Sequence, residues 1–170
     1  MARFYSSTFN GNGTAQYQII MDVTENSAAT SANASGTITV YLYAVKDVVN
    51  GYNFSYGNSL VVKVGSTTLL NSSNVGTVKC QSTGTTTQIW TGTWSSAKGA
   101  TSLTISAAFK QTQDTRYAGT ATGTITLPAK PTVYVYNGSA WKSGVAWDYN
   151  GSAWKISTKT YVHNGSTWKS

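Results

Sequence analysis

The stretch GTITVYLYAV, residues 36–45, decides the fold class because its side chains alternate in character without a break. Ile38, Val40 and Leu42 fall on one face of an extended chain, and Thr39 and Tyr41 fall on the other. Successive side chains of a β-strand point to opposite faces of the sheet, so this period predicts a strand with one buried face. Its β-branched and aromatic residues also suit a pleated sheet.

The same alternation recurs from residue 17 to residue 127, between short turns of small polar residues. The residues that share a face in these further segments are Tyr17, Ile19, Met21 and Val23; Leu60, Val62 and Val64; Val78 and Cys80; Trp90 and Trp94; Leu103, Ile105, Ala107 and Phe109; and Ala121, Gly123, Ile125 and Leu127. No segment carries an apolar stripe of helical period. About seven strands at this spacing predict an all-β protein with an immunoglobulin-like β-sandwich.

Two prolines mark the end of this block. Pro128 and Pro131 lie in LPAKP, and proline cannot donate a hydrogen bond to a sheet ladder. We therefore expect three parts: a β-sandwich domain with a short N-terminal arm over residues 1–127, a proline-containing linker over 128–132, and three aromatic β-hairpin repeats over 133–170.

The repeats are read from the copies YNGSAWK at 136–142 and 149–155 and HNGSTWK at 163–169. Each contains an Asn-Gly pair between β-prone arms, which is the strongest short-range signal for a hairpin because both residues tolerate positive φ. The expected turn residues are Asn137, Gly138, Asn150, Gly151, Asn164 and Gly165.

The arms of the repeats carry aromatic residues at equivalent places. The outgoing arms contribute Trp141, Trp154 and Trp168, and the incoming arms contribute Tyr134, Tyr136, Trp147, Tyr149 and Tyr161. His163 takes the place that tyrosine has in the other copies, as an aromatic substitute. An isolated hairpin is marginally stable in water. The rings therefore either pack on each other and on the sandwich, or are covered by another chain, or stay exposed for a ligand, and we take them as candidate binding residues for assembly or for glycan.

Charge and composition narrow the function classes. Charged residues make up 10% of the 170 residues, and the net charge is +7. The 12 Lys and Arg are scattered singly without a basic run, so we expect no nucleic-acid partner. The chain has no apolar run long enough to span a membrane, and its first residues, MARFYSSTFNGNGTAQ, lack the features of a secretory signal, so we expect neither a membrane partner nor secretion.

The residues needed for catalysis or for metal binding are sparse. The five acids are Asp22, Glu25, Asp47, Asp114 and Asp148. A glycosidase needs two carboxylates facing one cleft, whereas these are scattered along the chain. The single Cys80 and the single His163 belong to different segments and cannot supply a set of metal ligands. We therefore predict that the chain is not an enzyme and uses no metal or other cofactor.

One further pattern resembles a known family. YQIIMDVTENSAATSANASGTITVYLYA, residues 17–44, resembles the opening of immunoglobulin-like domains in structural proteins of long-tailed bacteriophages, especially those of Gram-positive hosts. GTATGTITLP, residues 119–128, is similar to the closing strand of that family, and the YNGSAWK copies resemble short repeats that end many phage virion proteins. The long receptor-binding modules of larger relatives are missing.

The resemblance implies a virion component, such as a tail-tip, fibre or head-decoration protein, made in the host cytoplasm and assembled on the particle. Its partners would be other virion proteins, including further copies of the same chain as a homo-oligomer. The alternative is a carbohydrate-binding module in which Trp141, Trp154 and Trp168 stack on cell-wall glycans.

Overall fold

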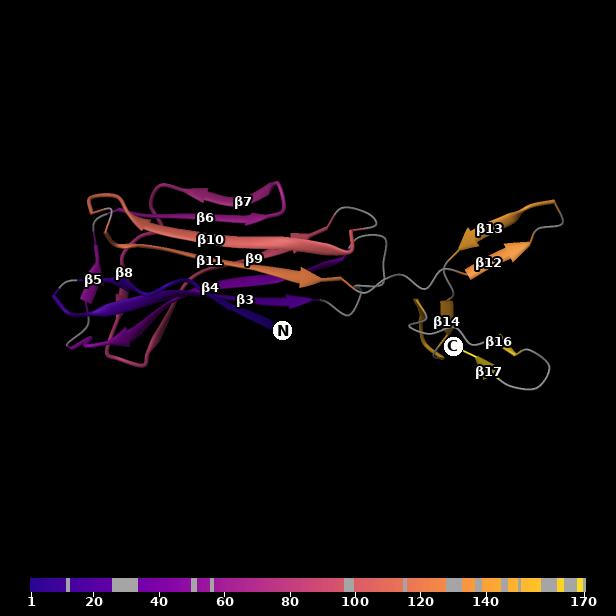
Figure 1. Ribbon diagram of the computed structural model, residues 1–170, viewed down its shortest axis with the longest axis horizontal. Helices are drawn as coiled ribbons and strands as arrows, with labels where there is room; N and C mark the ends of the chain where they lie inside the picture. The colour runs from indigo at the N-terminus through magenta and orange to yellow at the C-terminus, as the bar shows by residue number, and fades with distance from the viewer. Residues whose placement is uncertain are drawn as a thin grey trace.

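The computed structural model describes residues 1–11, 13–25, 34–49, 52–55, 57–96, 100–114, 116–127, 133–136, 139–144, 147–149, 151–156, 162–163 and 168–169. All the regular secondary structure in these ranges is β-strand (Figure 1). Two antiparallel sheets form the larger part, so the prediction of an all-β sandwich is confirmed.

The first sheet has the strand order β1-β3-β4-β9, with β2 also paired to β3. Its strands are β1 (Ala2–Tyr5), β2 (Phe9–Asn10), β3 (Gln16–Glu25), β4 (Ser35–Lys46) and β9 (Thr86–Ser95). The register places Met21 opposite Val40. The apolar faces of β3 and β4 therefore lie on the same side of the sheet.

The second sheet has the order β11-β10-β6-β7. Its strands are β6 (Asn58–Val64), β7 (Thr67–Ser72), β10 (Ser102–Gln111) and β11 (Ala118–Thr126). Ala107 lies opposite Val62 on one side and Ala121 on the other. These three residues are fully buried, so this sheet also turns one apolar face to the core.

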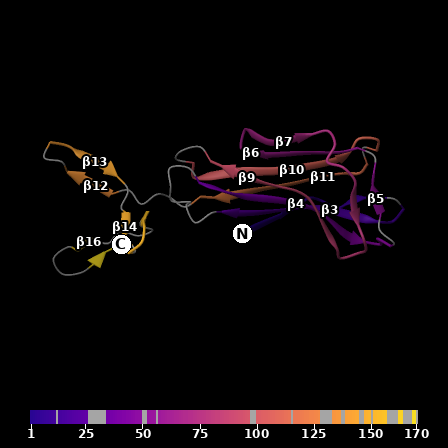
Figure 2. The same cartoon turned by 180° about the vertical axis from the view of Figure 1, so that it is seen from behind.

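The chain crosses between the sheets three times, from β4 to β6, from β7 to β9 and from β9 to β10. These crossings are the connections of immunoglobulin-like sandwiches, and the two layers are visible from both sides in Figures 1 and 2. Two short strands that lie in the first two crossings, β5 (Tyr52–Phe54) and β8 (Val78–Cys80), pair with each other at one end of the sandwich.

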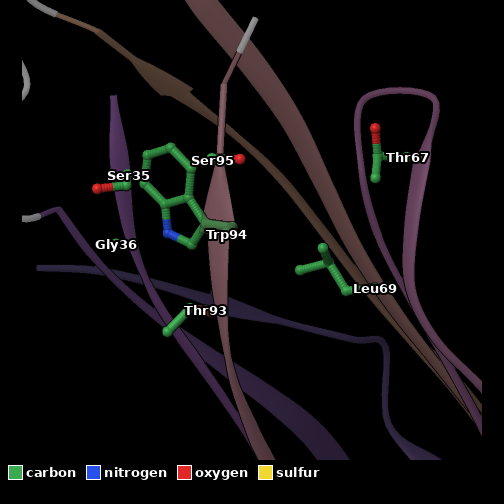
Figure 3. A pocket seen from close by; sticks show the side chains of 7 residues that line it. All are labelled: Ser35, Gly36, Thr67, Leu69, Thr93, Trp94 and Ser95. Carbon is green, nitrogen blue, oxygen red and sulfur yellow. The ribbon is translucent and has the colours of Figure 1, made fainter. Parts of the chain in front are cut away.

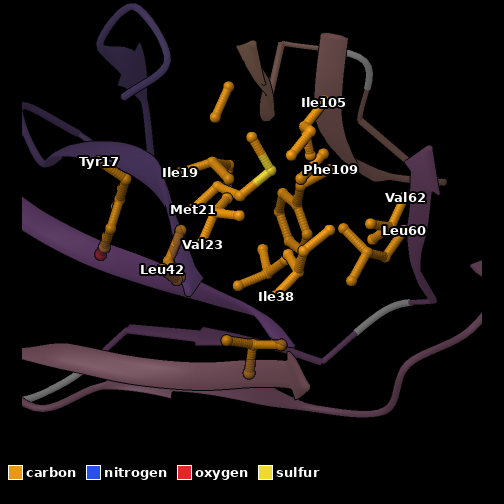
Figure 4. Packing of buried hydrophobic residues seen from close by; sticks show 14 of the residues in the cluster. Tyr17, Ile19, Met21, Val23, Ile38, Leu42, Leu60, Val62, Ile105 and Phe109 are labelled. Carbon is orange, nitrogen blue, oxygen red and sulfur yellow. The ribbon is translucent and has the colours of Figure 1, made fainter. Parts of the chain in front are cut away.

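The core fills the space between the two sheets (Figure 4). The alternating residues predicted from β3, β4 and β6 are all buried in this core. Aromatic rings fill one region of the core. Phe54 meets Tyr17 and Phe109 edge to face, with ring centroids 5.0 and 5.9 Å apart. Cys80 is buried on the same side of β8 as Val78, as the alternation predicted.

Strand β9 carries the largest side chain of the core. Trp94 is 2% exposed, and its indole N–H donates to the carbonyl of Thr24 at 3.2 Å. Trp90 packs partly buried against the same core. The register shifts between Val40 and Tyr41, where β4 meets β9. The sequence places Trp90 and Trp94 on one face of this strand, and the structure buries Trp94 on that face.

The N-terminal arm is a correction to the sequence prediction, because residues Ala2–Tyr5 form a strand of the first sheet. A segment of four residues is too short for its alternation to be read from the sequence. Arg3 donates to both carboxylate oxygens of Asp22 on β3, each at 2.6 Å. Strand β7 was also not predicted, because its residues are exposed or only partly buried and show no apolar period.

The C-terminal region contains three separate two-stranded sheets. They are β12 (Val133–Tyr136) with β13 (Trp141–Gly144), β14 (Trp147–Tyr149) with β15 (Trp154–Ile156), and β16 (Val162–His163) with β17 (Trp168–Lys169). Among the described strands, none of these six joins a sheet of the sandwich. The predicted linker, 128–132, lies outside the described residues.

Candidate functional site

The three C-terminal strand pairs share one backbone register. Tyr136 lies opposite Trp141, Tyr149 opposite Trp154, and His163 opposite Trp168. Directly opposed residues of an antiparallel pair have Cβ atoms about 4.5–5.5 Å apart. The sequence copies therefore correspond to one repeated structural position, at which an aromatic residue or histidine faces a tryptophan across the strands.

The second pair shows how two such rings are arranged. The centroids of Tyr149 and Trp154 are 5.2 Å apart, and the ring planes are tilted by 44°. The Tyr149 hydroxyl donates to the carbonyl of Gly151 at 3.0 Å, which holds the phenol against the loop. Tyr149 is 57% exposed and Trp154 is 65% exposed. The contact orders the two rings and leaves most of their surface open to a partner.

The loop that connects β14 to β15 is longer than a two-residue turn. With Tyr149 opposite Trp154, four residues separate the paired positions. Asn-Gly therefore fills the first half of the loop and not the whole of it. Gly151 has φ of +92°, a conformation that glycine adopts without steric cost. The other predicted turn residues lie outside the described residues: Asn137, Gly138, Asn150, Asn164 and Gly165.

The remaining predicted binding residues have different backbone positions. Tyr134 lies opposite Ser143, and Trp147 lies opposite Ile156. Each is two residues before the tyrosine of the aromatic pair, and so is on the same face of its strand as that tyrosine. Tyr161 lies outside the described residues.

The lysines of the repeats occupy the alternate register positions. Lys142 lies opposite Val135, Lys155 opposite Asp148, and Lys169 opposite Val162. Each lysine directly follows a tryptophan in the sequence, and neighbouring positions of a strand belong to opposite faces. Each strand pair thus has its tryptophan and its lysine at successive register positions, which belong to opposite faces of the pair.

Most of the acids within the described residues of the sandwich are engaged in ion pairs. Asp22 pairs with Arg3, Asp47 lies 3.7 Å from Lys46, and Asp114 lies 2.6 Å from Arg116. The hydrogen bond from Arg116 holds the pKa of the Asp114 carboxyl below its usual range. The ion pair of Asp22 therefore holds β1 against β3, and the ion pair of Asp114 holds the loop between β10 and β11.

The sandwich contains a cavity that the sequence did not predict. It measures about 360 Å³ and is lined by Ser35, Gly36, Thr67, Leu69, Thr93, Trp94 and Ser95. Figure 3 shows Thr67 and Leu69 of β7 on one side and the residues of β9 on the other. The two strands are distant in sequence, so only the folded arrangement brings these residues together.

Within the described residues there is no group of three or more His, Cys, Asp or Glu that could hold a metal ion. The same residues contain no helix long and apolar enough to cross a membrane. Comparison with protein-family models, with curated proteins and with solved structures found no match to this chain.

Proposed function

We propose that this chain is a non-enzymatic structural protein of a bacteriophage virion, at a tail tip, in a fibre or on the head, and that its C-terminal aromatic strand pairs mediate assembly or attachment. The resemblance of residues 17–44 and 119–128 to phage immunoglobulin-like domains supports the virion part of the proposal. The exposed Tyr149–Trp154 pair supports the part on assembly and attachment.

The observation that carries the proposal is the Tyr149–Trp154 pair, which is ordered by a ring contact and still exposed. The same register recurs at Tyr136–Trp141 and His163–Trp168. Aromatic residues are enriched at protein interfaces, where large apolar rings supply much of the binding energy. Three weak and equivalent contacts on one chain also add through effective concentration, so that three hold a partner that one would release.

The alternative function is recognition of cell-wall glycans, and the same rings favour it. Trp154 offers an exposed indole, and the exposed phenol of Tyr149 lies beside it with the ring planes tilted by 44°. On the face of the strand pair where these two rings lie, no register position holds a lysine. A neutral sugar ring bound on that face would therefore not meet a lysine. We place protein assembly first because the family resemblance points to a virion.

The virion part is tested by electron microscopy of phage particles that carry this chain, labelled with an antibody raised against it. We expect labelling at one defined part of the particle, with the chain also present in the protein content of washed particles. Absence of the chain from intact particles would contradict the proposal.

The role of the rings is tested on the full chain with Trp141→Ala, Trp154→Ala and Trp168→Ala combined. The readouts are oligomeric mass and binding to Gram-positive cells. We expect assembly to weaken by at least about 10²-fold, the lower end of the gain from linked contacts. Tyr5→Ala, which removes an exposed ring of the sandwich, is the matched control and should change neither readout. Loss of cell binding with unchanged mass would favour the glycan alternative.

A further inference from the structure

The two lateral sides of the sandwich, where the edges of the two sheets meet, are covered by side chains to different degrees. On the side of β11, rings of the N-terminal segment lie over glycines: a Cβ at Gly123 would meet Phe4 at 2.0 Å, and one at Gly119 would meet Phe9 at 2.7 Å. On the opposite side, β9 and β7 face each other across the cavity of about 360 Å³ (Figure 3). The chain therefore covers one side with its own aromatic rings and leaves space at the other.

Strand β9 is the last strand of its sheet on this open side. Its first half lies beside β8, where the Thr87 hydroxyl donates to the carbonyl of Lys79. Its second half, residues 90–95, pairs with β4 on one side and has no strand on the other among the described residues. Thr93 and Ser95 are exposed there. An unpaired strand edge of this kind is a template for another strand.

The protective features of an edge strand are missing from residues 90–95. Proteins blunt such edges with charged residues, with proline, with a bulge or by keeping the strand short. Strand β9 is ten residues long and contains no charged residue and no proline. The register irregularity belongs to β9 itself, where Ile89 is the extra residue opposite the Val40/Tyr41 step, and it directly precedes this segment. The edge strand β1, by comparison, is four residues long and carries Arg3.

The charge of the molecule indicates what can approach this edge. The chain carries +7, so most contacts between two copies bring like charges together. Strands β9 and β7 contain neither Lys nor Arg, and an antiparallel pairing of two equivalent strands around a two-fold axis is self-complementary. This side is therefore one at which two copies meet with little repulsion.

We propose that this edge of β9, residues 90–95, pairs antiparallel with the same edge of a second copy around a two-fold axis at Thr93, so that Thr93 lies opposite Thr93 and Thr91 opposite Ser95. This pairing joins the first sheets of two sandwiches into one continuous sheet. This interface is separate from the aromatic strand pairs and does not depend on their function. The added strand would run along the rim of the cavity between β9 and β7 and shield it from water.

The test uses the full chain with Trp141→Ala, Trp154→Ala and Trp168→Ala, so that assembly through the aromatic pairs does not contribute. Sedimentation at micromolar concentration should give twice the mass of one 18.1 kDa chain. Adding Thr93→Lys should weaken the dimer by at least about 10-fold, because like charges directly opposite destabilise a strand pair. Ser95→Lys, as a second variant, puts a lysine at each end of the paired edge and should weaken the dimer in the same direction. Thr104→Lys places the same charge on an exposed position of the central strand β10 and should leave the mass unchanged.

Hydrogen exchange on the same samples locates the interface. Amides of residues 90–95 should become protected as the concentration rises, and this protection should be absent in Thr93→Lys. A monomeric parent protein would overturn the proposal and leave the edge for a strand of a different protein. A dimer that resists both lysine variants, or protection that appears elsewhere, would equally overturn it.

Discussion

Trp94 and Trp154 show how differently the two regions of this chain use the same residue. In the sandwich Trp94 is 2% exposed between two sheets, whereas in the repeats Trp154 is 65% exposed on a strand pair. The sandwich has a second layer to cover a large ring, and a two-stranded sheet has none. Burial makes the first ring part of the core, and exposure leaves the second available to a partner.

Truncation of the buried ring should have the largest effect. We expect Trp94→Ala to lower the free energy of unfolding by about 3–5 kcal/mol, the usual range for a buried tryptophan. It also leaves the Thr24 carbonyl without its indole donor. Trp154→Ala is the matched control and should change the free energy by less than about 0.5 kcal/mol, as for other surface substitutions. Equal losses in urea unfolding of the two variants would remove the contrast between the regions.

A smaller effect is expected where an aromatic ring covers a glycine. Gly123→Ala places a Cβ 2.0 Å from the Phe4 ring, so Phe4 must leave the side of β11 that it covers. We expect a loss of about 1–3 kcal/mol in the free energy of unfolding, as for other overpacked sites.

The Phe4→Ala background provides the control for this prediction. There the added methyl group has room, and the cost of Gly123→Ala should largely disappear. A cost that persists without the ring would show that β11 itself rejects the methyl group.

The buried thiol should give the sandwich a modest dependence on pH. Burial raises the pKa of the Cys80 thiol in the folded protein, whereas the unfolded thiol ionises at about pH 8.5. The stabilisation from this group is complete below that pH and is lost as pH rises toward the folded pKa. Melting temperature in a reducing buffer should therefore fall more steeply above about pH 8.5 in the parent than in Cys80→Ala. Parallel curves for the two proteins would contradict this assignment.

The sequence predicted the sandwich well because its strands alternate over long stretches, as in Ile38–Val40–Leu42 of β4. It did not predict β1 as a strand, since Ala2–Tyr5 is short and becomes sheet only by pairing with β3. The cavity could not be predicted from the sequence either. Leu69 and Trp94 line it together only because the chain crosses from one sheet to the other between them.

At the candidate site the three sequence copies correspond to one repeated backbone register. That their rings form a binding site stays a prediction. The length of the loop was not predictable from Asn-Gly alone. That dipeptide suits a two-residue turn, and it also suits a longer loop that needs one residue at positive φ, as Gly151 provides.

The most direct test of the contrast between the regions is calorimetry of a chain that ends at Lys130, beside the full chain. If the rings of the repeats serve to bind a partner, the repeats contribute nothing to the stability of the sandwich. The shortened chain should then unfold cooperatively with a melting temperature within about 4 °C of the full chain, equivalent to less than about 1 kcal/mol. A larger fall, or loss of the cooperative transition, would show that the repeats are a stabilising part of the sandwich and would contradict the account.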